Sequence, residues 1–498
     1  MAGPERHTGS DTETGTGAGG DTGTGAGGDT GTGAGSDTGT GAGTGGDGGE
    51  VDVVVVGLGV GGEHVAGRLA EAGLDVVGVE AELVGGECPY WACVPSKMMV
   101  RAGNLLAEAR RVPGRAGRAE VTADFAPVAA RVRDEATDDW DDRAAVDRFT
   151  GKGGRFVRGR GRLTGAGRVE VDGRVFTARR GVVLATGSRP RVPPVPGLDG
   201  VPYWTNRDAV SAKEAPASLL VLGGGPIGAE LAQAYARFGT DVTVVEAADR
   251  LLPSDEPEAG ELLAEVFRAE GIDVRTGARA VGVRHEADTF HLALDGGGEL
   301  AARHLLVATG RGADLTGLGV EHAGLDPRAR ALDPDGRMRV APGVWAVGDV
   351  TGRGAFTHVA MYQGEIAARD LLGEPGPEAD YRALPRVTFT DPEVGSVGLT
   401  ERAARDRGLR VRTGLARLSS STRGWIHGAG GEGLVKLVVD EERGVLVGAT
   451  SAGPAGGEVL YGLAVAVHAE VPVERLRHMM YAYPTFHRAV EDALRDLG

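Results

Sequence analysis

Two runs of apolar residues, each leading into a glycine-rich turn, dominate the pattern of this chain. The run 51–56 reads Val-Asp-Val-Val-Val-Val and continues into Gly57-x-Gly59-x-x-Gly62. A continuous apolar run bounded by glycines is typical of a strand buried in a parallel sheet. The residues that follow predict a helix and then a second strand that ends at Glu80.

The same order recurs later in the chain. The apolar residues 218–222 lead into Gly223-x-Gly225-x-x-Gly228, and the next predicted strand ends at Glu246. These glycines permit a tight turn and let a pyrophosphate approach the helix N-terminus, while the acid can bind ribose hydroxyls. With strand, turn, helix and acid in register, the two segments predict two dinucleotide-binding folds. A cofactor-free relic at one of them is the alternative.

The acid in the second segment bears on the choice of nicotinamide cofactor. A carboxylate at Glu246 can accept a hydrogen bond from a ribose 2′-hydroxyl and repels a 2′-phosphate. NADH is therefore favoured over NADPH, although Arg250 lies close enough in sequence to leave NADPH open.

The two cysteines of the chain, Cys88 and Cys93, lie shortly after the first glycine-rich turn. We expect Pro89 to keep the segment from being a regular helix, in which five residues span about 7.5 Å. A helix is predicted to begin near 95–97, and a thiol at a helix start close to Lys97 favours its thiolate. Such a pair beside a bound cofactor can carry two electrons. Two unrelated buried thiols, or half of a metal site, are the alternatives; the metal reading is weak because no further cysteine or nearby histidine cluster is present.

Composition adds a tail and a charge balance to this picture. The chain has 498 residues, a formal net charge of −16 and a pI of about 5.3, which argues against nucleic acid or an anionic membrane as a partner. Residues 14–47 repeat Thr-Gly-Thr-Gly-Ala-Gly-Gly-Asp with almost no apolar side chains, so we predict a disordered tail over 1–50. A calcium-binding β-roll is the alternative, but its period and apolar positions differ.

The chain contains neither an apolar N-terminal segment typical of a signal peptide nor an apolar run of about 18 residues. We therefore expect a cytoplasmic protein. In that compartment a cysteine pair is more often catalytic than structural.

Together with five further motifs, these residues resemble the class I pyridine nucleotide–disulfide oxidoreductases, which include glutathione reductase, dihydrolipoamide dehydrogenase and mercuric reductase. The resemblance covers essentially residues 51–498. The further motifs are Ala185-Thr-Gly-Ser-Arg-Pro190, Ala308-Thr-Gly-Arg311, Val344-Trp-Ala-Val-Gly-Asp349, Thr390-Asp-Pro-Glu-Val-Gly-Ser-Val-Gly398 and Tyr483-Pro-Thr485.

The resemblance implies FAD in the first site and NAD(P)H in the second, with hydride passing from nicotinamide to flavin. Cys93 would face the flavin and Cys88 would meet the substrate. Lys97 and Glu230 match a pair held beside the flavin, although a surface lysine and a solvated acid are the alternative. The residues implied in cofactor binding are Gly57, Gly59, Gly62, Glu80, Gly86, Thr186, Gly187, Gly223, Gly225, Gly228, Glu246, Gly310, Gly348, Asp349 and His358.

The C-terminal segment departs from the family pattern. Disulfide reductases of the family carry His-x-His-Pro-Thr, whereas this chain has tyrosine at both histidine positions, Tyr481 and Tyr483, and Arg488 at the position of the orienting acid. Tyrosine titrates near 10 and histidine near 6.5, so Tyr483 is a poor base but can donate a proton. His487 and His358 are the conceivable substitutes. Mercuric reductases also use tyrosine, but they add a C-terminal cysteine pair that this chain lacks.

The predicted fold class is α/β: two dinucleotide-binding, Rossmann-like domains and a C-terminal α+β dimerisation domain. The expected boundaries are 51–195 with 312–380 for FAD, 196–311 for NAD(P) and 384–498 for an interface domain that forms a homodimer. The leading hypothesis is an FAD-dependent NAD(P)H oxidoreductase acting on a small disulfide or dithiol. The alternatives are a quinone reductase in which the disulfide is secondary, and a redox sensor without catalysis.

Overall fold

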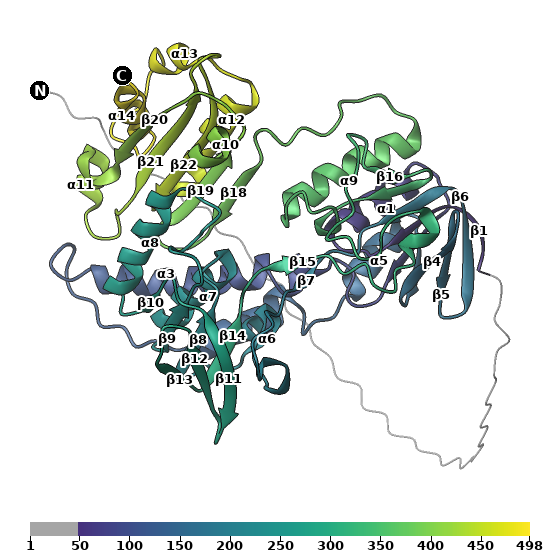
Figure 1. Cartoon of the computed structure of the whole chain (residues 1–498), viewed down its shortest axis with the longest axis horizontal. Coiled ribbons are helices and arrows are strands. Elements are labelled where there is room, and N and C mark those ends of the chain that lie inside the picture. Colours follow the sequence, from purple (N-terminus) through teal and green to yellow (C-terminus); the bar gives the residue numbers. More distant parts are fainter. Residues whose placement is uncertain (1–47) are drawn as a thin grey trace, which may run out of the picture. The chain divides into compact units, whose positions relative to one another are not determined.

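The computed structural model describes residues 48–498 (Figure 1). Most of the predicted tail, residues 1–47, lies outside the described residues. The last two residues of the tail predicted over 1–50, Gly49 and Glu50, belong instead to a strand, in which they pair with Phe176 and Thr177. Within the described range, none of the helices is both long enough and apolar enough to span a membrane.

The first sheet has eight strands from two separate parts of the chain. Its central strands are parallel in the order β17-β6-β1-β2-β3; β16 adds an antiparallel edge, and β4 and β5 join through β6. The order reverses at β1, whose carboxyl end is therefore the point where a ligand can enter. The strands are β1 Gly49–Val56, β2 Val76–Glu80, β3 Arg155–Arg158, β4 Gly161–Gly165, β5 Arg168–Val171, β6 Arg174–Leu184, β16 Arg339–Ala341 and β17 Val344–Ala346.

Apolar side chains of this sheet are buried on both faces, which explains the continuous apolar run of β1. Val53 and Val55 join one core with helices α1 (Val60–Glu71), α5 (Arg143–Gly151) and α9 (Thr357–Leu372). Val54 and Val56 join a second core on the other face. Helices α1 and α9 approach closely, since a Cβ at Gly61 would lie 3.0 Å from the carbonyl oxygen of Ala360.

The second sheet repeats this plan on a smaller scale. Its four strands are all parallel in the order β10-β9-β8-β14, and a three-stranded antiparallel sheet, β11-β12-β13, follows β10 in the chain. The strands are β8 Ser218–Leu222, β9 Asp241–Val245, β10 Asp273–Arg275, β11 Ala280–Glu286, β12 Thr289–Leu294, β13 Glu299–Ala302 and β14 His304–Val307; the helices are α6 Asn206–Ser211, α7 Pro226–Arg237 and α8 Pro257–Ala269. A two-stranded sheet joins β7 (Arg189–Pro190) to β15 (Arg311–Gly312).

The C-terminal part is an antiparallel sheet of five strands in the order β18-β19-β22-β21-β20. Helices α12 and α14 share a core with it that includes Val435, Leu463 and Leu494. The strands are β18 Pro385–Thr388, β19 Glu393–Gly398, β20 Val411–Arg417, β21 Leu434–Asp440 and β22 Val445–Gly453; the helices are α10 Glu401–Asp406, α11 Thr422–His427, α12 Gly456–His468, α13 Val473–Arg477 and α14 Arg488–Asp496. The predicted α/β class, with two parallel-sheet folds and a C-terminal α+β part, is confirmed.

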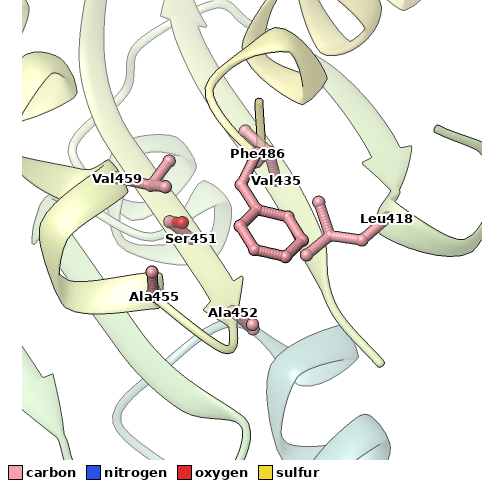
Figure 2. Close-up of a pocket in the computed structure, with 9 residues that line it drawn as sticks. Leu418, Val435, Ser451, Ala452, Ala455, Val459 and Phe486 are labelled. Carbon is pink, nitrogen blue, oxygen red and sulfur yellow. The ribbon is translucent and has the colours of Figure 1, made fainter. Parts of the chain in front are cut away.

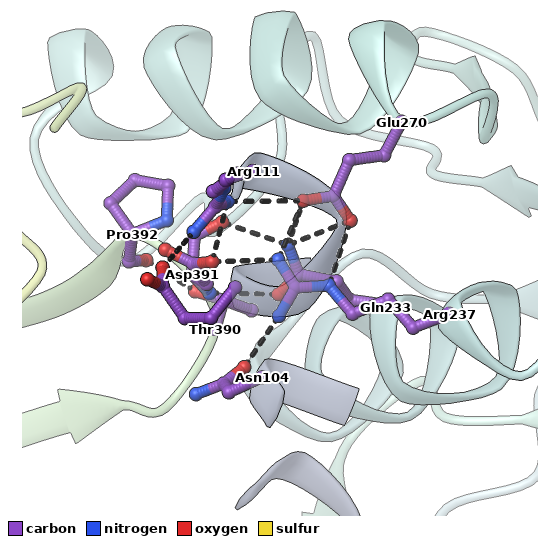
Figure 3. A network of polar contacts seen from close by, with 9 residues as sticks. Asn104, Arg111, Gln233, Arg237, Glu270, Thr390, Asp391 and Pro392 are labelled. Atoms are coloured by element: carbon purple, nitrogen blue, oxygen red, sulfur yellow. Dashed lines mark hydrogen bonds and ion pairs between the residues drawn. The ribbon is translucent and has the colours of Figure 1, made fainter. Parts of the chain in front are cut away.

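Three parts of the chain meet at a buried arginine (Figure 3). Arg237, at the end of α7, is 3% exposed and donates to Glu270 at 2.9 Å and to Asp391 at 2.8 Å. It also donates to Asn104 of α3 (Cys93–Arg111). Arg111 donates to the same carboxylate of Asp391 at 2.8 Å. The cluster thus ties α3, α7 and the segment before β19 together.

We predict that Arg237→Met lowers the free energy of unfolding by about 3 kcal/mol, because it removes the buried cation that pairs with Glu270 and Asp391 and leaves both carboxylates to Arg111 alone. Denaturant-induced unfolding measures the change. Arg131→Met, which removes an exposed pair with Glu135, is the control and should leave stability unchanged. Equal stability of the Arg237 variant and the wild type would contradict this role.

Candidate active site

The first glycine-rich turn can be built only with glycine at two positions. Gly57 has φ +92°, and a Cβ there would lie 2.5 Å from the carbonyl oxygen of Ala185. A Cβ at Gly62 would lie 2.0 Å from the oxygen of Gly57. At Gly59, which caps α1, the nearest atom to a Cβ is the Cα of Gly86 at 4.0 Å. The turn is therefore closed on the protein side and open at Gly59, as an approaching pyrophosphate requires.

The second turn repeats this geometry at the start of α7. Gly223 has φ +112°, and a Cβ there would lie 2.5 Å from the oxygen of Ala308. A Cβ at Gly228 would lie 2.0 Å from the oxygen of Gly223, whereas one at Gly225 would meet no atom within 4 Å. Both turns thus fit a dinucleotide, because each leaves its helix N-terminus accessible at the middle glycine.

The strand-end acids also act in the same way in both folds. Each glutamate accepts one hydrogen bond from the middle residue of its Gly-x-Gly and another from the amide two residues after itself. Burial raises the pKa of Glu80. The bonds run from Leu58 N and Glu82 N to Glu80, at 2.7 and 2.8 Å, and from Gly224 N and Ala248 N to Glu246, at 2.6 and 2.7 Å. Each carboxylate oxygen keeps a second lone pair that a ribose hydroxyl can use.

The remaining residues predicted to bind cofactor follow strand ends or glycine turns. Thr186 and Gly187 begin two residues after the end of β6, Gly310 comes directly before β15, and Gly348 is two residues after the end of β17. Gly86 has φ +67°, and a Cβ there would lie 2.8 Å from the Cα of Gly59. This close approach sets the cysteine segment against the first turn.

Asp349 lies in a polar chain that sequence reasoning did not find. Its carboxylate accepts from Ser188 Oγ at 2.6 Å, and Arg311 donates to the same hydroxyl at 2.9 Å. Burial raises the pKa of Asp349, and the Ser188 hydrogen bond opposes this rise. Because Ser188 and Arg311 stand 123 residues apart in sequence, the motifs alone do not reveal the connection.

The two cysteines lie on different helices, and the break between them is not where we predicted it. Cys88 is in the one-turn helix α2 (Glu87–Tyr90), and Cys93 is the first residue of α3. Pro89 is inside α2, since proline is tolerated in a first helical turn. The chain bends instead at Trp91 and Ala92, where φ is −130° and −137°. α3 therefore begins two residues before the predicted 95–97.

The Cys93 sulfur meets several groups that favour a negative charge. Cys88 is a close neighbour of this sulfur, which lies 3.4 Å from Oγ1 of Thr357, the first residue of α9. The Cys88 contact, the Thr357 hydroxyl and the charge of Lys97 together lower the pKa of Cys93 to about 6, against the opposing effect of burial. The N-termini of α3 and α9 also converge here, and a helix N-terminus favours a thiolate. The contact with Cys93 and burial raise the pKa of Cys88, so it keeps its proton.

Lys97 and Glu230 form an ion pair one helical turn after Cys93. Lys97 Nζ lies 2.7 Å from Glu230 Oε2, and the glutamate side chain is 6% exposed. The other carboxylate oxygen, Oε1, accepts from the backbone amide of Phe389 at 2.9 Å. The Phe389 ring lies 4.7 Å from the ammonium nitrogen. The acid thus orients the cation, and the pair is not the alternative of two solvated side chains.

Phe486 anchors the C-terminal tyrosine segment, because it packs against the core of the C-terminal sheet. Together with Leu418, Val435 and Val459 it lines an apolar hollow (Figure 2). Tyr481 turns toward the same core and donates to the carbonyl oxygen of Leu476 at 3.0 Å. Burial raises its pKa. The Tyr481 hydroxyl therefore has a structural role.

Tyr483 lies on the outside of this anchored segment. It is 64% exposed, its hydroxyl bonds Thr422 at 3.1 Å, and the Arg488 guanidinium lies 5.4 Å from its ring. His487 is exposed at the start of α14. Among residues 48–498 of one chain, no hydrogen bond joins either side chain to the cysteines.

His358, the third candidate, is adjacent to Thr357 but directed elsewhere. Its Nε2 lies 2.9 Å from the carbonyl oxygen of Pro385, to which it donates. Its ring stacks on Phe356. The residue of this segment that reaches Cys93 is Thr357, which sequence reasoning missed; its place at a predicted helix start next to His358 was the available signal.

Comparison with known proteins agrees with this geometry. A family model described as pyridine nucleotide-disulphide oxidoreductase matches residues 51–364, and one described as its dimerisation domain matches 384–494. The chain belongs to the pyridine nucleotide-disulphide oxidoreductase family. The predicted resemblance is confirmed: this oxidoreductase acts on sulfur groups, and its family binds FAD and a pyridine nucleotide.

Relatives with two different names align along most of the oxidoreductase. Dihydrolipoyl dehydrogenase of Thermus scotoductus is 35% identical over 463 residues, covering 90% of this chain and 97% of the relative. Mercuric reductase of Staphylococcus aureus is 31% identical, covering 88% and 80%. Among solved structures, LpdA from Mycobacterium tuberculosis (28% identity, TM-score 0.78) covers 90% of this chain and 100% of its own. The HOCl-induced flavoprotein disulfide reductase RclA from Escherichia coli (26%, 0.78) covers 89% and 99%.

We predict that alkylation of Cys93 in the reduced protein accelerates as pH rises through about 6, well below the ordinary thiol value near 8.5. Cys88→Ala removes the largest cause of the lowered pKa, so its midpoint should rise and alkylation at neutral pH should slow. Peptide mass analysis after timed labelling measures both. A Cys93 midpoint near 8.5 in the wild type would contradict the thiolate assignment.

Proposed function

We propose that this protein passes electrons between a pyridine nucleotide and a small disulfide or dithiol through FAD and the Cys88–Cys93 pair. The observation that carries the proposal is that Cys88, Thr357 and Lys97 surround Cys93, an arrangement that lowers the pKa of Cys93 to about 6 and raises the pKa of Cys88. A thiol pair that serves only packing has no need of this asymmetry. Bound FAD and a bound nicotinamide would supply the hydride and electron transfer that opens and closes the disulfide.

The protein's own groups would manage charge and protons at the sulfurs. Cys88 Sγ holds its proton against the Cys93 thiolate, so the proton can shift to Cys93 as Cys88 attacks a substrate disulfide. The substrate S–S bond breaks, a mixed disulfide with Cys88 forms, and the first leaving thiolate takes the proton from Cys93. Cys93, a thiolate again, then attacks the mixed disulfide. This closes the pair and releases the second substrate thiolate, which takes up a proton from solvent or from an outside donor. Lys97, oriented by Glu230, would stabilise negative charge beside the sulfurs.

The residues around Glu246 favour NADH as the nucleotide. Arg250, which could have bound a 2′-phosphate, is 17% exposed and engaged: it lies 2.9 Å from Asp249 and donates to the carbonyl oxygen of Pro253 at 3.2 Å. The Glu246 carboxylate accepts a hydrogen bond from the Gly224 amide at the second turn, where its charge would repel a 2′-phosphate.

The interface domain supports a homodimer. Large apolar side chains are exposed on it, and the matching family model describes a dimerisation domain. They are Trp425 and Ile426 of α11, Tyr461 and Val465 of α12, and Met479, Met480 and Tyr483 after α13. A second copy of this chain would cover these side chains. In that homodimer the Tyr483 hydroxyl would act as a proton donor toward the thiols of the partner.

We predict that Cys88→Ser abolishes disulfide turnover with NADH while the cofactor absorbance is unchanged, because the attacking sulfur is lost. The measurement is steady-state NADH oxidation with a set of small disulfides. Ser211→Ala, at an exposed hydroxyl of α6, is the control. Retained disulfide turnover would refute the proposal, whereas turnover restricted to quinones in both proteins would favour the quinone alternative.

We predict a kcat/KM for NADH at least about tenfold above that for NADPH, a difference of about 1.4 kcal/mol. Glu246→Gln should shrink this ratio, because it removes the charge that repels a 2′-phosphate but keeps an oxygen for the Gly224 amide. Asp273→Asn, at the exposed end of β10, is the charge-matched control. An NADPH preference in the wild type would overturn the assignment.

A further inference from the structure

The segment between the two cysteines is held from outside by the start of α6. Asn206 is 6% exposed, and its Nδ2 donates to Glu87 Oε2 at 3.1 Å and to the carbonyl oxygen of Trp91 at 2.8 Å. Glu87 immediately precedes Cys88, and Trp91 lies two residues before Cys93. The side-chain amide of Asn206 therefore binds both ends of residues 87–91, the segment that determines the spacing of the two sulfurs.

The next residue of α6 strengthens this grip. Arg207 donates to Glu87 Oε1 from Nε at 3.0 Å and from Nη2 at 2.6 Å, and its guanidinium lies 5.2 Å from the centre of the Trp91 ring. Arg311 also pairs with Glu87, at 3.4 Å. Arg311 also donates to Ser188, and Ser188 donates to Asp349, which lies shortly after β17. These hydrogen bonds therefore connect the contacts on Glu87 to Asp349.

A third contact comes from a backbone segment in an unusual conformation. The Trp140 ring stacks on Trp91, with centroids 5.5 Å apart and planes at 23°, and its Nε1 donates to the carbonyl oxygen of Tyr90 at 3.3 Å. Asp138, Asp139 and Trp140 have φ of +49°, +53° and +58°. Three successive non-glycine residues in this region are strained, and such strain persists only where the surroundings hold it.

We propose that Asn206, Arg207 and Trp140 are positioning residues for the thiol pair: they clamp residues 87–91 so that Cys88 stays in contact with Cys93. The inference rests on the proposed function, since it assigns these residues to the electron-carrying pair. Glu87 makes its printed side-chain contacts within this cluster, with Asn206, Arg207 and Arg311, whereas Trp91 and Trp140 also pack against a neighbouring apolar core. When the clamp is loosened, α2 can turn away from α3, and Cys93 then loses the neighbouring Cys88 thiol.

The test uses Asn206→Leu, which removes both amide contacts, and Trp140→Ala, which removes the stack and the Tyr90 contact. In the reduced holoenzyme, the midpoint for Cys93 alkylation should rise by about one pH unit in each, so that labelling at pH 6 falls about fivefold. Cys88, Thr357 and Lys97 are the groups that act on Cys93, and only the first should move. Trp140→Phe, which retains a stacking ring, should remain near wild type.

Trp345→Ala is the matched control for Trp140→Ala, because Trp345 also donates its Nε1 to a neighbour, Asp370, and contacts Arg339 through its ring, but away from the thiols. It should not change Cys93 labelling. Arg207→Lys is a milder variant if either clamp substitution prevents folding. Unchanged Cys93 midpoints in folded clamp variants would overturn the proposal, as would an ordinary thiol midpoint in the wild type. Labelling requires no turnover, so loss of the proposed function would show separately as absent disulfide reduction.

Discussion

The contact between α3 and α7 is the constraint on which the site depends. α3 carries the second cysteine, α7 begins at the second glycine-rich turn, and polar residues spaced seven apart on α3 each meet a partner along this contact. The partners are Glu230 of α7 for Lys97, Arg237 of α7 for Asn104, and Asp391, in the segment before β19, for Arg111. Sliding α3 along α7 would separate the first two pairs and leave buried charges unpaired. The first nucleotide fold, the second, and the thiols are therefore held in one register.

Asp391 extends that register into the C-terminal part. The residues before β19 run along one face of α7, where Phe389 N donates to Glu230, and Asp391 bonds both Gln233 and Arg237. Residues at i, i+3 and i+7 share a helix face, so Glu230, Gln233 and Arg237 can all contact this segment from the same side of α7. The acid that orients Lys97 is thereby fixed by the same segment that leads into the interface domain.

The features that could be predicted from sequence are those set by local stereochemistry. Glycine at 57, 62, 223 and 228 is required because a Cβ would strike a nearby carbonyl oxygen, and such requirements leave the same pattern wherever the turn is built. The acids Glu80 and Glu246 follow at fixed distances for the same reason. Contacts between distant segments leave no such pattern. Thr357 stands 264 residues from Cys93, and its hydroxyl is recognisable as a thiol partner only once α9 is placed. The bend at Trp91 and Ala92 was missed because it depends on contacts with Asn206 and Trp140, not on the proline.

The surroundings of the two tyrosines and the charge of the Cys93 thiolate explain how the site can work without the family's histidine. Tyr481 is committed to the interface core, so of the two substituted positions only Tyr483 presents a free face, and a tyrosine there is a donor rather than a base. A base is needed to free Cys88 of its proton. The Cys93 thiolate neighbours that thiol and can receive its proton as the substrate disulfide is attacked, then pass it to the first leaving thiolate. Proton storage within the sulfur pair thus leaves an outside residue only the protonation of the second leaving thiolate, which a tyrosine can perform. A clamp that keeps the two sulfurs together then matters more here than where a histidine shares the work.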